Sequence, residues 1–323
     1  MSILVALWVG TLGVIYVSSY IEMTKQNESM LKAHSEMYEL SGMDTDFFEP
    51  IRPAPNGEPD FKHRFEDSPM FKLSTFYTVA FSYDGNVIEI KNVGEQTITH
   101  TYTTAGTYTI SMAGQATLYS TNAETAAVSF ANNTLIAALD GKLGEIFSTL
   151  VDRIDSEGNL LPDAQPRFYK TFYKCTNLKN YIDYDLFSGI SGAPVSNMYR
   201  STFEGATKIY SIVSEDIFHV SGAPAEAMFH STFKGCTALY GEIPEFLFQD
   251  IEGKPAKSMF ESTFEGCSKI ESFKGWGGNL SIYLFAGIMG EPAEAMFKAT
   301  FKGCKKLTGD INPIFYNVKG EPA

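Results

Sequence analysis

The stretch MFHSTFKGCTAL, which begins at Met228, decides the fold because similar stretches recur along the chain. Close copies are MYRSTFEGATKI at Met198, MFESTFEGCSKI at Met259 and MFKATFKGCKKL at Met296, and a more divergent copy, RFYKTFYKCTNL, begins at Arg167. The equivalent threonines at 171, 202, 232, 263 and 300 give a period of 31, 30, 31 and then 37 residues. Self-similarity at this period is typical of a solenoid, in which each unit buries its apolar face only by stacking on its neighbours.

The first half of each unit has the spacing of an amphipathic helix. In the third unit Phe229, Thr232, Phe233 and Cys236 lie at i, i+3, i+4 and i+7, which predicts one stripe of an α-helix. Gly235 stands near the end of this pattern, where a helix stop is expected. The pattern predicts a buried repeat core made of Phe203, Phe229, Phe233, Cys236, Phe260, Phe264, Cys267, Phe297, Phe301 and Cys304.

The second half of each unit is expected to hold a short strand and a second short helix. Leu239 and Ile243 suit the strand, and the apolar cluster at 247–251 is spaced for the helix. Two positions of the repeat change the sign of their charge between copies, and both are expected on a solvated face. One position holds Arg200, His230, Glu261 and Lys298, and the other holds Glu204, Lys234, Glu265 and Lys302. The fourth unit carries a six-residue insertion, and Trp276 within it is either a candidate contact residue or a cover for the base of its own loop.

The repeat carries one recognisable core, Phe233-Lys234-Gly235-Cys236-Thr237-Ala238-Leu239, of the form F-x-G-C-x-x-L. On these residues the region 165–323 resembles the BspA-like branch of leucine-rich-repeat surface proteins. The longer period and the G-x-P-A turn depart from the shorter units of that family. The resemblance implies a cell-surface binding or adhesive protein and names no ligand. The final Gly320-Glu321-Pro322-Ala323 repeats the letters at 290–293, which precede a unit, so a further unit is expected to follow.

The four cysteines, Cys175, Cys236, Cys267 and Cys304, occupy one slot of the repeat, where the second unit has Ala206. A slot that accepts cysteine or alanine is a small buried site, in which a thiol behaves as a small hydrophobe. Disulfide pairing is not favoured because Cys267 has equivalent neighbours on both sides. A zinc site is not favoured either, because no close pair such as C-x2-C occurs.

The N-terminus is apolar from residue 2 to residue 20 without a charged side chain, which is long enough to span a bilayer. A polar, amphipathic segment follows, and no positively charged region precedes it. Residues 1–40 resemble the N-terminal helix of a mature type IV pilin, although Val5 stands where that family usually has glutamate. The resemblance implies a helix that anchors in the membrane and then packs with its copies in a filament; an ordinary membrane anchor and a buried soluble helix remain the alternatives. The expected membrane or assembly residues are Leu4, Val5, Leu7, Trp8, Val9, Leu12, Val14, Ile15 and Tyr16.

Three segments connect this helix to the repeats. Residues 41–70 are rich in proline and predict an extended linker. The runs 76–81 and 87–90 predict strands around a hairpin turn. The run 100–110 is similar to the closing hairpin of PKD-like β-sandwich modules, so residues 71–120 are expected to form such a module. Residues 121–164 carry a helical pattern at Leu143, Ile146, Phe147, Leu150 and Ile154 and are expected to cap the first repeat.

Composition argues against several functions. The net charge is −13 and the basic residues are dispersed along the chain, which speaks against nucleic acid and against an anionic membrane surface. The five histidines lie in separate segments, and no nucleophile elbow, zinc-protease motif or phosphate-binding loop occurs, so neither an enzyme nor a cofactor or metal site is expected. The acidic run 155–159 is expected to be a plain loop rather than a calcium site, since the downstream glutamate is missing.

The sequence as a whole predicts an α+β multidomain chain with a long N-terminal helix, a small β-sandwich and a leucine-rich-repeat-like solenoid of about 30-residue units. The favoured function is an exported cell-surface filament subunit, anchored in the inner membrane before assembly, that associates with itself through residues 1–40 and displays an adhesive repeat domain. The alternative is a singly anchored or pilus-tip adhesin that uses the repeats to bind protein or glycan.

Overall fold

The computed structural model describes residues 71–73, 76–83, 86–93, 96–98, 111–139, 141–182, 184–212, 217–274, 284–308, 315 and 317–319. The predicted membrane or assembly helix at 1–40, the linker at 41–70, the hairpin at 100–110 and Trp276 lie outside these residues. The chain divides into two compact units, one made of Met1–Glu66, Val79–Ile90 and Thr101–Gly114 and the other of Asp67–Thr78, Lys91–His100 and Gln115–Ala323. No helix in the described part is long and apolar enough to cross a bilayer.

Six strands precede the repeats: β1 (Phe71–Leu73), β2 (Phe76–Tyr83), β3 (Asn86–Val93), β4 (Gln96–Ile98), β5 (Ser111–Leu118) and β6 (Val128–Ser129). They form two three-stranded sheets, in the orders β3-β2-β5 and β4-β1-β6. In the second sheet β1 is antiparallel to both neighbours, with Leu73 opposite Gln96 and Val128. β2 and β3 cover the runs 76–81 and 87–90 that the sequence predicts as strands.

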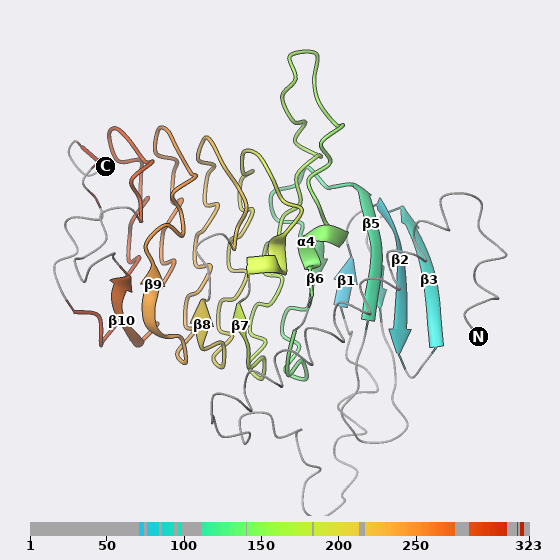
Figure 1. Ribbon diagram of the computed structural model, residues 1–323, viewed down its shortest axis with the longest axis horizontal. Coiled ribbons are helices and arrows are strands. Elements are labelled where there is room, and N and C mark those ends of the chain that lie inside the picture. The colour runs from blue at the N-terminus through green and yellow to red at the C-terminus, as the bar shows by residue number, and fades with distance from the viewer. Residues whose placement is uncertain are drawn as a thin grey trace, which may run out of the picture. The chain divides into compact units, whose positions relative to one another are not determined.

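The repeats form a stack of five coils, seen side by side in Figure 1, which we number coil 1 (165–195), coil 2 (196–225), coil 3 (226–256), coil 4 (257–293) and coil 5 (294–319). Alternate backbone N–H groups of one coil donate to carbonyl oxygens of the next coil. From coil 2 to coil 3 these bonds are Tyr199 to Met228, Ser201 to His230, Phe203 to Thr232 and Gly205 to Lys234, with N···O distances of 2.8, 2.8, 2.9 and 2.7 Å. The backbone itself therefore ties each repeat to its neighbour.

The first half of each unit is not the α-helix that the sequence predicts. Every fourth residue has a left-handed backbone, as at Ala227 (φ 52°), Ser231 (φ 58°) and Gly235 (φ 73°) in coil 3. The N–H groups between the cross-coil donors bond three residues back, as from Thr232 to the Phe229 carbonyl oxygen at 3.2 Å. We call this segment (197–206 in coil 2, 227–236 in coil 3, and their equivalents) the turn ribbon. Its period of four residues resembles a helical period over a short stretch, which explains the incorrect prediction.

In coils 1 to 4 the second half of the unit contains the predicted short strand, and these strands pair in parallel. β7 (Tyr181–Ile182) pairs with β8 (Ser211–Ile212), and β9 (Tyr240–Pro244) pairs with β10 (Lys269–Lys274). The predicted second helix at 247–251 is a series of turns, whereas the equivalent part of coil 1 forms a 3-10 helix, η2 (Tyr184–Phe187). Parallel bridges such as Gly222 to Ile251 close the far edge of the coils.

The core of the stack is built from three columns of aromatic rings, with one ring per coil in each column. In the column that contains Phe229, its ring lies 5.5 Å from Tyr199 and 5.7 Å from Phe260, nearly parallel to both. The other two columns run through Phe203, Phe233 and Phe264 and through Phe218, Phe248 and Phe285. Burying one such side chain contributes about 1.5–3 kcal/mol, so most of the cohesion between coils comes from these rings.

The segment before the repeats continues the stack and is mostly irregular. Phe130 stacks on Phe172 at 5.3 Å, and its N–H donates to the Thr171 carbonyl oxygen at 2.7 Å, so residues 127–132 cover the outer face of coil 1. The helix predicted over 143–154 is limited to α4 (Leu143–Ile146). Phe147 is buried, whereas Ile154 is about half exposed, in an antiparallel bridge with Leu160.

Candidate functional site

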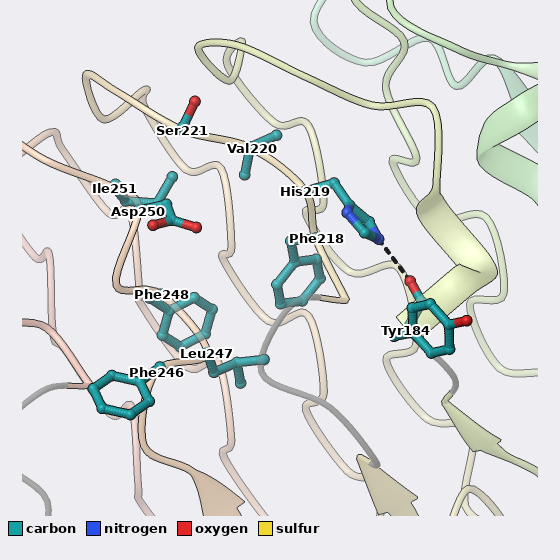
Figure 2. Close-up of a pocket in the computed structure, with 10 residues that line it drawn as sticks. All are labelled: Tyr184, Phe218, His219, Val220, Ser221, Phe246, Leu247, Phe248, Asp250 and Ile251. Atoms are coloured by element: carbon teal, nitrogen blue, oxygen red, sulfur yellow. Dashed lines mark hydrogen bonds between the residues drawn. The ribbon is translucent and has the colours of Figure 1, made fainter.

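A shallow pocket of about 350 Å³ crosses coils 1 to 3 (Figure 2). Buried Phe218 and Phe248 form its floor. Tyr184 and His219 lie at one end, and Asp250 lies at the other. His219, which has a left-handed backbone (φ 51°), places Nε2 2.7 Å from the Tyr184 carbonyl oxygen. The pocket therefore has an aromatic floor and a polar rim, as small-molecule sites do.

His219, Ser221 and Asp250 line this pocket, but they do not form a catalytic relay. His219 Nε2 is engaged by the Tyr184 carbonyl oxygen, and no hydrogen bond joins the three side chains in the described structure (Figure 2). Nucleophilic catalysis requires a nucleophile in hydrogen-bond reach of its base. This arrangement can hold a ligand against the aromatic floor, and nothing in its geometry activates a nucleophile.

The turn ribbons carry two columns of charged side chains on their outer surface, and the column Glu204, Lys234, Glu265 and Lys302 alternates in sign. Glu265 of coil 4 lies between two lysines, with Lys234 Nζ of coil 3 at 2.8 Å and Lys302 Nζ of coil 5 at 3.2 Å from its carboxylate oxygens. In the neighbouring column Lys298 Nζ lies 2.8 Å from Glu261. In the column of Glu265 the changes of sign between copies are therefore complementary between adjacent coils, whereas Arg200 and His230 in the neighbouring column are both basic.

The column around Glu265 shifts the ionisation of its members. The hydrogen bond from Lys234 holds the pKa of Glu265 at about 2, and the same bond raises the pKa of Lys234. His230 lies in the other column, where burial and the nearby Arg200 charge lower its pKa. These shifts follow from the charge order of the coils and do not by themselves mark a reactive site.

A row of tyrosines lies on the short strands. Tyr181, Tyr210 and Tyr240 belong to successive coils, with ring centroids 6.5 Å and 6.4 Å apart. Tyr240 is 57% exposed, in contrast to the buried rings of the core. Exposed tyrosines offer apolar area with a polar tip and are enriched at binding surfaces. This row is the second candidate contact surface of the repeats.

The cysteine slot holds free thiols that donate across coils. Cys236 Sγ lies 3.1 Å from the Phe203 carbonyl oxygen of coil 2, and Cys267 makes the same contact with Phe233 at 3.0 Å. Burial raises the pKa of Cys175 to about 12 and that of Cys304 to about 11. These thiols are therefore weak nucleophiles at neutral pH. No group of three or more histidine, cysteine or acidic side chains suitable for a metal ion occurs among the described residues.

The structure places the predicted repeat-core residues as follows. Seven are fully buried: Phe203, Phe229, Phe233, Cys236, Phe260, Phe264 and Cys267. Phe297, Phe301 and Cys304 in coil 5 are half-buried. The acidic run 155–159 is a turn in which Asp155 Oδ1 accepts the backbone N–H groups of Glu157 and Asn159. None of these residues lines the pocket, whose His219 and Asp250 the sequence does not single out.

Comparison with protein-family models, with curated protein sequences and with solved structures finds no match to this chain.

Proposed function

We propose that this chain is an exported surface protein of the filament-subunit type, in which residues 1–40 anchor and assemble the subunit and the coils form an adhesive surface. The alternative, a singly anchored or filament-tip adhesin, gives the coils the same role. In both cases the repeat region binds and does not catalyse.

The adhesive part of the proposal rests on one observation. The buried residues are similar from coil to coil, whereas the surface residues differ. Coils 1 to 4 repeat the same buried rings and the same cross-coil bonds, while positions such as Arg200, His230 and Glu261 differ from coil to coil. A stack of this kind offers an extended surface whose residues can change without disturbing the core, as binding solenoids do.

The filament part of the proposal rests on the apolar, uncharged stretch at 2–20 and the amphipathic segment that follows. The presence of Val5 instead of an acidic residue favours the alternative of a tip or singly anchored protein. Electron microscopy of material sheared from cells, with N-terminal sequencing of the protein band, separates the two. Filaments that contain this chain support the subunit; a protein that stays with membranes until detergent is added supports the anchored adhesin.

The adhesive role is tested on the full chain by comparing attachment of cells with and without it. Its loss should abolish attachment to the native surface while growth and export of other surface proteins continue. Attachment that persists unchanged in cells without the chain would contradict the proposal.

A further inference from the structure

Coil 1 differs from the other four coils at the positions that face solvent. Residues 168–182 contain three lysines and no acidic side chain, in a chain of net charge −13, whereas Arg167 is buried and donates to the Ser120 and Ser196 carbonyl oxygens. The sequence-based view of dispersed basic residues therefore overlooks one cluster. Since a local positive region on an acidic protein attracts anions, the turn ribbon of coil 1 is expected to attract them more than the paired charges of Lys234 and Glu265 do.

Two lysines of this cluster occupy positions where the other coils carry small residues. Lys174 (φ 54°) stands in the slot of Gly205, Gly235, Gly266 and Gly303. Lys170 (φ 55°) stands in the slot that holds Ser201, Ser231, Ser262 and Ala299. A left-handed backbone favours glycine, so the lysine at 174 is a local departure that folding of the ribbon does not require.

Tyrosines replace the charged columns beside these lysines. Lys170 Nζ lies 4.9 Å from the ring centroid of Tyr169 and 5.5 Å from that of Tyr173, and Lys174 Nζ lies 5.0 Å from Tyr173. The Arg200 guanidinium of coil 2 lies 5.9 Å from Tyr169. In coils 3 to 5, by contrast, ribbon lysines such as Lys234 pair with a carboxylate, and no carboxylate pairs with Lys170 or Lys174 among the described residues.

From this geometry we propose that Tyr169, Lys170, Tyr173 and Lys174, with Arg200, form a binding site for an acidic polysaccharide. We call these five residues the Tyr-Lys patch. The ammonium and guanidinium groups would pair with sulfate or carboxylate groups of the glycan. The half-exposed rings would stack against the C–H faces of its sugars. This inference rests on the proposed adhesive role and gives it a ligand class.

Two other classes of ligand fit the patch less well. A protein partner requires an apolar centre to its interface, and none of the large exposed apolar side chains of the described structure lies in 165–180. A nucleic acid carries a phosphate at every nucleotide, and binding such a ligand needs more clustered cations than the three of the Tyr-Lys patch. A glycan with spaced charges needs only the few cations and rings that coil 1 supplies.

The test measures binding of a chondroitin sulfate octasaccharide to the full chain by calorimetry at low and at high salt. The Lys170→Ser/Lys174→Gly variant carries the residues that coil 2 uses at these positions, so the ribbon should fold as before or better. The control variant, Lys254→Ser/Lys319→Ser, removes two exposed lysines from other edges of the coils. The Tyr169→Leu/Tyr173→Leu variant keeps apolar area and removes the rings.

We expect the octasaccharide to bind the parent chain with an affinity that falls as salt is raised. The double lysine variant should bind at least about tenfold more weakly, since two charge-assisted contacts are lost, while its Tm is no lower than that of the parent. The control should bind as the parent does, and the leucine variant should lose affinity for the octasaccharide. Neutral dextran should not compete.

Several results would overturn the inference: no binding to the parent chain, equal binding by the double lysine variant, or equal loss in the control. Equal or tighter binding of polyglutamate would indicate an acidic protein segment instead, and tighter binding of an oligothymidylate would indicate nucleic acid. Cells that carry the lysine variant and still attach normally would refute the Tyr-Lys patch and leave the proposed adhesive function standing.

Discussion

Replacing Ala227 by glycine tests the turn ribbon directly, because this residue has a left-handed backbone (φ 52°) in coil 3. An L-residue in that conformation costs about 1–2 kcal/mol, which glycine relieves. Glycine in turn loses about 0.5–1 kcal/mol through its greater freedom in the unfolded chain, and the buried methyl group of Ala227, which is 5% exposed, contributes about 0.8 kcal/mol. These terms nearly cancel, so the free energy of unfolding should change by less than about 0.5 kcal/mol.

An α-helix at the same place gives a different result. Alanine to glycine inside a helix costs about 1 kcal/mol, and loss of the same methyl group brings the total near 2 kcal/mol. Ala225, two residues earlier and without a positive φ, provides the matched control, and its glycine variant should lose about 1 kcal/mol. Urea denaturation followed by near-ultraviolet circular dichroism measures all three proteins. If the Ala227 variant loses about 1.5 kcal/mol or more of its free energy of unfolding, the turn ribbon is refuted. A loss as large as that of the Ala225 variant refutes it as well.

Three further predictions concern the charge column of Glu265 and the cysteine slot. Glu265→Gln should lower stability by about 0.5–1 kcal/mol, because its two lysine partners are largely exposed to solvent. The folded pKa of Glu265 is lowered from 4.5 to about 2, so its stabilisation is complete above pH 4.5 and is lost as the pH falls towards 2. Acid titration of the variant should accordingly show a shallower loss of stability over that range, with Glu252→Gln as control. Cys236→Ala should cost about 1–2 kcal/mol, whereas Ala206→Cys, which supplies the thiol that the other coils have, should cost less than about 1 kcal/mol; the opposite order in urea denaturation would contradict the shared slot. The native thiols should react slowly with a disulfide reagent and all four quickly in denaturant, since burial raises the pKa of Cys175 to about 12; rapid reaction of the folded chain would show an accessible thiolate.

The sequence predicts which residues the repeat buries better than it predicts the backbone that buries them. Phe229, Phe233 and Cys236 are fully buried, and their spacing suffices to identify them. The same spacing fits a period of 3.6 and a period of 4, so it cannot distinguish an α-helix from a ribbon over eight residues. Small residues at every fourth position, Ala227, Ser231 and Gly235, are the signal that separates the two, because each of them tolerates a left-handed backbone better than a bulky side chain does.

The candidate sites depend on neighbours from different repeats, which a single repeat does not reveal. His219 meets Tyr184 across 35 positions of sequence, and only the stacking of coils brings them together. The sequence predicts part of the charge pattern, since aligning the copies places Glu204, Lys234, Glu265 and Lys302 at equivalent positions. The ion pairs between coils follow only when equivalent positions are known to lie next to each other. The distances from Lys234 and Lys302 to Glu265 show that they do.

The charge order of the turn ribbons constrains changes in repeat number. Removal of coil 3 alone would set Glu204 against Glu265, two like charges, although it would also set Arg200 against Glu261. Removal of coils 3 and 4 together would set Glu204 against Lys302 and keep that pairing, but it would bring Arg200 against Lys298. Either removal therefore places one pair of like charges on this surface, so the order of charges favours the present number of layers.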